Sequence, residues 1–113
     1  MPMSHDLASL VQRIRTLLEQ RGADPTMPLL TAMEHTLTDG YARALELEGE
    51  RLRLERRIGD LAHRLDGPEQ AGELRDLAER LRSADEDLAN LRDALAPLQQ
   101  RVDAARTAAW PFY

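Results

Sequence analysis

The chain has 113 residues and a formal net charge of −5, and 31% of its residues are charged while only 4% are aromatic. Such a length accommodates one domain. A composition rich in Leu, Ala, Arg, Glu and Asp is typical of long helices that pack along narrow seams. The absence of Cys excludes disulfides and thiolate metal sites. The acidic balance argues against general nucleic-acid binding, which needs clustered cations in excess.

No apolar run approaches the roughly 20 residues of a membrane span. The first six residues also lack the basic and apolar regions of a signal peptide. We therefore expect a cytoplasmic protein that does not insert into a membrane. All fifteen basic residues are Arg. A GC-rich coding sequence accounts for this, and guanidinium recognition of carboxylates or phosphates is the alternative.

The first segment predicts a short helix over residues 4–21, because its apolar residues recur at the spacing of one helix face. These residues are Leu7, Leu10, Val11, Ile14, Leu17 and Leu18. Gly22 is a stop signal, and Pro25 and Pro28 prevent a continuous helix, so residues 22–28 are predicted to form a connector. The next helix begins somewhere between Thr26 and Thr31.

A seven-residue apolar repeat predicts a long helix over residues 29–65 that packs in the manner of a coiled coil. One seam position is held by Leu30, Leu37, Ala44, Arg51, Ile58 and Leu65, and the other by Met33, Gly40, Leu47, Leu54 and Leu61. Arg51 is the charged exception. Gly40 is either a tolerated weak spot or a place where another helix approaches closely.

Residues 66–69 predict a turn, in which Gly67 can end one helix with a positive φ and Pro68 can open the next. The repeat then resumes, which predicts a second long helix over residues 70–109. Its seam residues are Leu74, Leu77, Leu81, Ala84, Leu88, Leu91, Leu95, Leu98, Val102, Ala105 and Ala109. Pro97 should kink this helix while the seam continues past it.

A turn this short forces the two long helices to lie antiparallel. We expect a register in which Leu61 meets Leu74, Leu54 meets Leu81, and Arg51 meets the small Ala84. This register predicts the flanking ion pairs Arg57–Glu73, Glu50–Arg80, Arg43–Asp87, Glu48–Arg92 and Glu34–Arg106, with Glu55 against Asp85 as a mismatch.

The fold expected from these elements is all-α: an antiparallel helical hairpin of coiled-coil type, with the short N-terminal helix completing a three-helix bundle at one end. The stripe of the first helix includes Val11 and Leu18 beyond the seam, so it is wide enough to fill a groove between two helices. The first long helix has apolar residues beyond its seam, and they suggest where the short helix packs against it. They are Leu29, Tyr41, Leu45 and Leu52. A two-helix stalk would remain over roughly residues 50 to 88.

Leu45 and Leu52 are candidate partner-binding residues. The first helix is too short to cover Leu52, and two stalks side by side would form a four-helix arrangement that hides both residues. The sequence therefore predicts a homodimer.

The aromatic tail over residues 110–113 is a second candidate for partner binding. Trp110, Phe112 and Tyr113 supply three of the four aromatic residues of the chain. In the antiparallel arrangement the tail comes near Leu17, Leu18, Met27 and Leu29. It is predicted to fold back as a plug on the open end of the bundle, and a docking peptide with aromatic anchors is the alternative.

No residue pattern predicts catalysis or a cofactor. Asp60 and His63 have the helical spacing seen in carboxylate metal bundles, but those bundles need two Glu-x-x-His motifs and further Glu residues, and Leu61 holds the seam here. A solvated face is the simpler interpretation. The run from Arg51 to Arg57 is best read as a salt-bridged face, with an acidic patch on a partner as the alternative.

The stretch from Glu34 to Leu45, continued from Leu52 to Ile58, resembles short uncharacterised helical proteins of GC-rich actinobacteria. This resemblance implies a cytoplasmic bacterial protein and no activity. The hairpin also resembles transcription factors that insert a coiled-coil finger into RNA polymerase, which place acidic residues at the tip. Asp66 and Glu69 occupy the tip here, and Arg64 lies beside them.

The sequence favours a non-enzymatic protein–protein interaction module, a helical adaptor or scaffold that self-associates and has an unknown protein partner. One alternative is a regulator of a larger machine such as RNA polymerase that acts through the hairpin tip. Another is a metal-binding helical protein completed by dimerisation.

Overall fold

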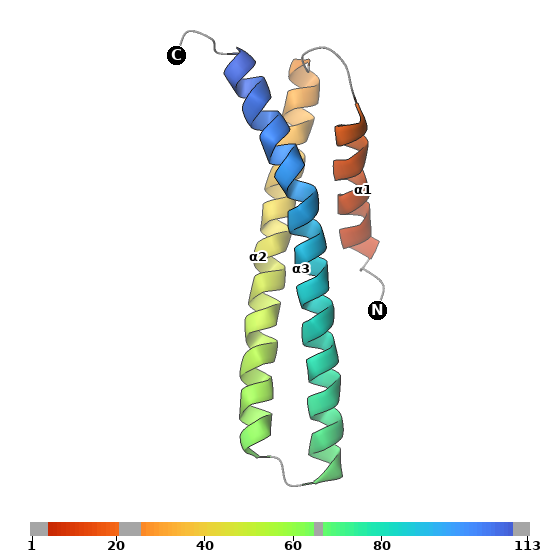
Figure 1. Cartoon of the computed structure of the whole chain (residues 1–113), viewed down its shortest axis with the longest axis vertical. Coiled ribbons are helices and arrows are strands. Elements are labelled where there is room, and N and C mark those ends of the chain that lie inside the picture. Colours follow the sequence, from red (N-terminus) through yellow and green to blue (C-terminus); the bar gives the residue numbers. More distant parts are fainter. Residues whose placement is uncertain (1–4, 21–25, 65–66, 110–113) are drawn as a thin grey trace.

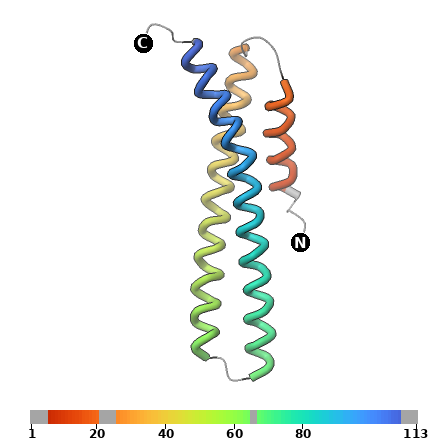
Figure 2. Tube along the Cα trace, in the orientation of Figure 1, coloured from red at the N-terminus to blue at the C-terminus, as the bar shows by residue number. Residues whose placement is uncertain are grey.

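The computed structural model describes residues 5–20, 26–64 and 67–109, and they form three helices (Figure 1). Helix α1 spans His5–Glu19, α2 spans Met27–His63, and α3 spans Pro68–Ala109. Helices α2 and α3 run antiparallel over their whole length, and α1 lies beside both of them near one end, as the backbone trace shows (Figure 2). The molecule is a rod with extents of 65 × 28 × 15 Å. The predicted hairpin with a three-helix bundle at one end is confirmed.

The helix ends differ slightly from the predicted ones for local reasons. Helix α2 begins at Met27 rather than at residue 29, because Thr26 caps it: the Thr26 side chain accepts a hydrogen bond from the Leu29 amide at 3.3 Å. Pro28 fits the first turn, where its missing N–H has no helical partner. Helix α1 ends at Glu19 rather than at residue 21.

The turn at the hairpin tip uses Gly67 differently from the prediction. Helix α2 ends at His63, with Arg64 as its C-cap at φ −116°, and Gly67 does not adopt a positive φ. Its carbonyl instead accepts the Ala71 amide at 3.2 Å, so Gly67 is the N-cap of α3 and Pro68 begins the helix. A residue before proline is restricted to extended conformations, which suits an N-cap.

Three of the five predicted flanking ion pairs are present and support the predicted register, while Glu50 and Arg80 form no ion pair in the described part of the chain. Arg57 pairs with Glu73 at 2.9 Å near the tip, and Glu34 pairs with Arg106 at 3.3 Å near the other end. Glu48 pairs with Arg92 between them. Helix α3 continues through Pro97 without a break, and its C-terminal part leans across α2 (Figure 1).

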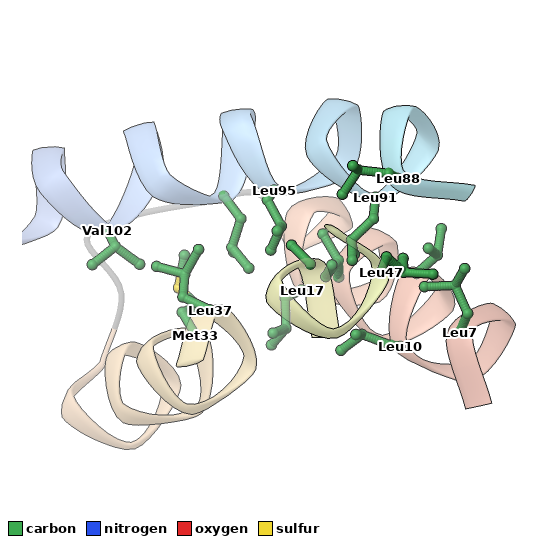
Figure 3. Close-up of a cluster of buried hydrophobic side chains, with 14 of the residues drawn as sticks. Leu7, Leu10, Leu17, Met33, Leu37, Leu47, Leu88, Leu91, Leu95 and Val102 are labelled. Carbon is green, nitrogen blue, oxygen red and sulfur yellow. The ribbon is translucent and has the colours of Figure 1, made fainter. Parts of the chain in front are cut away.

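The buried apolar residues of the rod form two hydrophobic clusters, one after the other along its length. The larger cluster joins all three helices, and Figure 3 shows its side chains converging from α1, α2 and α3. Leu7, Ile14, Leu91, Leu98 and Val102 are fully buried in it. The smaller cluster holds only residues of α2 and α3, with Leu54, Leu61, Leu77 and Ala84 at its centre. The second cluster is the core of the predicted stalk.

Polar contacts also attach α1 to the hairpin. Arg13 of α1 donates to Thr36 at 3.1 Å and pairs with Asp39 at 2.5 Å. Arg101 of α3 donates to the carbonyl oxygens of Leu17 and Leu18 at 3.2 and 2.7 Å. The carbonyls of the last helical turn have no partner within their own helix, so Arg101 caps the C-terminus of α1 from a neighbouring helix.

Candidate interaction surface

Helix α1 covers one side of the hairpin and leaves the opposite side free. Thr36 and Arg101 face α1, and Leu29 is half-buried against the three-helix cluster. Tyr41 lies across the seam from Thr36, and its hydroxyl donates to Gln99 at 2.9 Å. We call this second side, which contains Tyr41, Leu45 and Leu52 of α2, the open face.

Leu29, Tyr41 and Leu45 of α2 were expected to mark where the first helix packs, and this is wrong for Tyr41 and Leu45, whereas Leu52 was expected to lie beyond the reach of that helix and does so. Only Leu29 packs against the cluster that includes α1. Tyr41, Leu45 and Leu52 are 45%, 68% and 50% exposed. The reason is geometric: Leu29 and Thr36 flank the seam on one side, whereas Tyr41 and its neighbours flank it on the other.

The open face contains a groove of about 370 Å³ between α2 and α3. Its floor is formed by the seam residues Ala44 and Leu95, which are 7% and 2% exposed. Tyr41, Leu45, Glu48, Arg92 and Ala96 form its walls. All the described residues that line this groove belong to α2 and α3, and none belongs to α1. An apolar floor with one ion pair at its edge suits an apolar side chain of a helical partner.

In the stalk, which α1 does not reach, the seam between α2 and α3 is less buried than in the three-helix part. In the three-helix part Leu88 and Leu95 are both 2% exposed. In the stalk the equivalent residues of α3, Leu74 and Leu81, are only half-buried, and so is Ile58 of α2. Two helices cannot enclose a seam as three can, so the stalk retains apolar surface that a further helix would bury.

Arg51 resolves the charge mismatch that the register predicted. Its guanidinium lies 3.9 Å from Glu55 and 3.5 Å from Asp85, between the two carboxylates. Ala84 opposite it is buried and small, as expected. The Nε atom of Arg51 is buried and has no hydrogen-bond partner. Arg51 therefore neutralises a like-charge contact that would otherwise repel.

A second group of charges lies at the junction of bundle and stalk. Arg43 was predicted to pair with Asp87, but its ion pair is with Glu46 at 2.9 Å. Burial raises the pKa of the Asp87 carboxyl, and the positive charge of Arg43 opposes that rise. Glu86 and Glu50 raise the pKa of Asp87 further. Asp87 thus holds its proton more tightly in the folded protein than in the unfolded chain. Its contribution to stability is therefore greatest at low pH, and it is lost as the pH rises past the ordinary pKa of an aspartate and through the raised pKa of the folded state.

The other candidates from the sequence are placed as follows. Glu69 is exposed in the first turn of α3, while Asp66 at the same tip lies outside the described residues. The aromatic tail with Trp110, Phe112 and Tyr113 also lies outside them. Among the residues it was predicted to cover, Leu17 is buried and Met27 is 69% exposed.

Asp60 and His63 are both exposed near the end of α2. Within the described ranges no three His, Asp or Glu side chains are grouped closely enough to hold a metal ion. In the same residues no helix is both long and apolar enough to cross a bilayer.

The chain matches no protein-family model, no curated protein and no solved structure.

Sequence reasoning missed the role of Ala96, which lines the groove, and of Arg101, which caps α1. A signal for Ala96 was available. It recurs with Ala89 at the heptad interval, at exposed positions beside the seam of α3, and small residues at that interval permit close helix packing. No local signal identifies Arg101, because its acceptors lie more than eighty positions away in the chain.

Proposed function

We propose that the protein is a cytoplasmic, non-enzymatic interaction module that self-associates through the open face of its helical hairpin. The observation that carries this proposal is the exposure of Tyr41, Leu45 and Leu52 in one row beside an apolar groove. Single exposed apolar residues are ordinary, but three of them on one side of a rod whose seam is only partly covered are typical of an interaction surface. A rigid helical rod of this kind suits an adaptor or scaffold.

Sedimentation equilibrium tests this proposal directly. At tens of micromolar we expect the wild-type chain to sediment with about twice its mass of 12.8 kDa. The double variant Leu45→Glu/Leu52→Glu should sediment as a monomer, because charges buried without partners disfavour association. The matched control is Ala32→Glu/Ala42→Glu, which makes the same charge change at exposed positions of α2 away from the open face, and it should remain dimeric. A wild-type chain that is monomeric throughout would contradict self-association.

The two alternatives from the sequence stay predictions. Action through the hairpin tip depends on Asp66 and Glu69, and the open face makes no use of either residue. Metal binding completed by dimerisation would require Asp60 or His63 to enter an interface, and both lie away from the row formed by Leu45 and Leu52.

A further inference from the structure

The open face is asymmetric in side-chain size. Helix α2 presents the large residues Tyr41, Leu45 and Leu52. Helix α3 presents the small residues Ala89 and Ala96, which are exposed and seven positions apart. The face thus has a ridge on one helix and a trough on the other. Such a surface is complementary to itself when the ridge of one copy meets the trough of a second copy.

The open face is also asymmetric in charge. Its α2 side carries Glu48 and Glu55, and its α3 side carries Arg82 and Arg92. Within one copy Glu48 already pairs with Arg92, Glu55 lies 3.9 Å from Arg51, and Arg82 pairs with Glu79 at 3.2 Å. Asp85 is the exception on α3, and Arg51 already neutralises it at 3.5 Å. A contact between α2 and the α3 of another copy therefore extends the Glu48–Arg92 pair into a network of alternating charges, whereas α2 against α2 brings like charges together.

Symmetry leaves two ways to join a pair of rods by this face. If the two-fold axis runs along the rods, both copies point the same way and each α2 lies on the other copy's α3. If the axis crosses the rods, the copies point opposite ways, and α2 lies on α2. In the second arrangement Glu48 approaches Glu48 of the other copy, Arg92 approaches Arg92, and the alanines of α3 face each other across a gap.

We propose that two copies of this chain pack open face to open face and point in the same direction, with each α2 seated on the partner's α3. This inference rests on the self-association proposed above. In the register that the Glu48–Arg92 pair marks, Leu47 lies level with Leu88 of the same hydrophobic cluster, so Leu45 lies level with Ala89. With the axis along the rods, Leu45 then faces the partner's Ala89, and Leu52 lies against the stem of the partner's Arg82.

The size of the face agrees with this arrangement. From Tyr41 to Ala62 the helix rises by about 32 Å, and two adjacent helices are about 20 Å wide. A contact of that outline covers about 600 Å² on each copy, which is at the lower limit of stable interfaces. The half-buried seam residues Ile58, Leu74 and Leu81 lie within the same length of the rod. A second copy would therefore bury the seam of the stalk, as α1 buries the seam of the three-helix part.

Disulfide cross-linking distinguishes the two arrangements, because the chain contains no Cys. We expect the double variant Leu45→Cys/Ala89→Cys to become a covalent dimer for most of its population on mild oxidation. Each single variant should stay monomeric on a non-reducing gel, since identical positions lie across the axis, too far apart for a bond that needs Cβ atoms about 3.5–4.5 Å apart. Leu52→Cys/Arg82→Cys, one heptad further along the stalk, should link in the same way.

Two control variants make the outcome decisive. Ala42→Cys/Glu86→Cys places both thiols on exposed positions away from the open face and measures random oxidation. Leu45→Cys/Leu52→Cys would link only if α2 lay on α2. Cross-linking of that control, or no variant above background while sedimentation shows a dimer, overturns the arrangement and leaves self-association intact. A monomeric wild-type chain overturns both.

Discussion

At Gly40 the side chain of Leu95 from α3 lies against the backbone of α2, in space that a Cβ atom would need. A Cβ atom built there would lie 2.4 Å from Cδ2 of Leu95, and Leu95 is 2% exposed. Leu95 could move away from a new Cβ atom only toward the groove whose floor it forms, because its other neighbours are close-packed. The close approach considered from the sequence is therefore the correct interpretation of Gly40, and the glycine lets Leu95 form the floor of the groove on the open face.

Gly40→Ala and Gly72→Ala should change stability in opposite directions. Both substitutions gain about 0.5–1 kcal/mol from helix propensity. At Gly72 nothing lies within 4 Å of the new Cβ, so Gly72→Ala should keep that gain. At Gly40 overpacking costs about 1–3 kcal/mol, so the free energy of unfolding should fall. Urea denaturation followed by circular dichroism measures both, and a Gly40→Ala variant as stable as Gly72→Ala would show that Leu95 moves freely.

Among the three elements, α1 depends most on contacts from outside itself. It is the shortest helix, and isolated helices of its length are marginal in water. Its apolar face is buried through Leu7, Val11 and Ile14, and its last carbonyls receive the guanidinium of Arg101. Apolar packing provides most of its stability, and Arg101 determines where the helix can end.

Replacing Arg101 by Met should loosen α1 while leaving α2 and α3 folded. Met preserves the aliphatic stem and removes the donors to Leu17 and Leu18. Loss of hydrogen bonds from a charged group costs about 1.5–3 kcal/mol, reduced here by partial exposure of Arg101. Amides in the last turns of α1 should exchange hydrogen faster than in the wild type. Arg56→Met, an exposed position on the stalk, is the control, and equal exchange in both variants would mean that Arg101 does not hold α1.

The whole molecule has an uneven distribution of buried surface along its length. The bundle end contains the three-helix cluster, and the stalk contains the smaller cluster of Leu54, Leu61, Leu77 and Ala84. Regions with fewer buried apolar contacts open at lower free energy. The isolated chain should therefore be least stable at the stalk, where the proposed partner would bind.

Hydrogen exchange along α2 tests this difference. In the variant Leu45→Glu/Leu52→Glu, amides near Leu61 should exchange faster than amides near Leu47. In the wild-type chain the difference in exchange rate between these two sets of amides should become smaller as the protein concentration rises. The reason is that a second copy binds the folded stalk and so stabilises it against opening. A difference that does not change with concentration would mean that the stalk has no partner in solution.

The sequence by itself determined the three helices, their antiparallel order and their register. Heptad spacing, proline positions and a short turn are local properties, and a one-residue shift in register would misplace every seam residue and ion pair together. The contacts Glu34–Arg106, Glu48–Arg92 and Arg57–Glu73 could therefore be predicted before the structure was known.

Only the tertiary structure decided which side of the hairpin α1 covers. In a heptad pattern the rows on the two sides of a seam are equivalent, so Leu29 and Tyr41 look alike until a third helix packs on one of them. The same packing brings Arg101 to the end of α1 and leaves Leu45 and Leu52 exposed. The candidate surface follows from that choice, because burial depends on residues far apart in the chain and not on the period of the sequence.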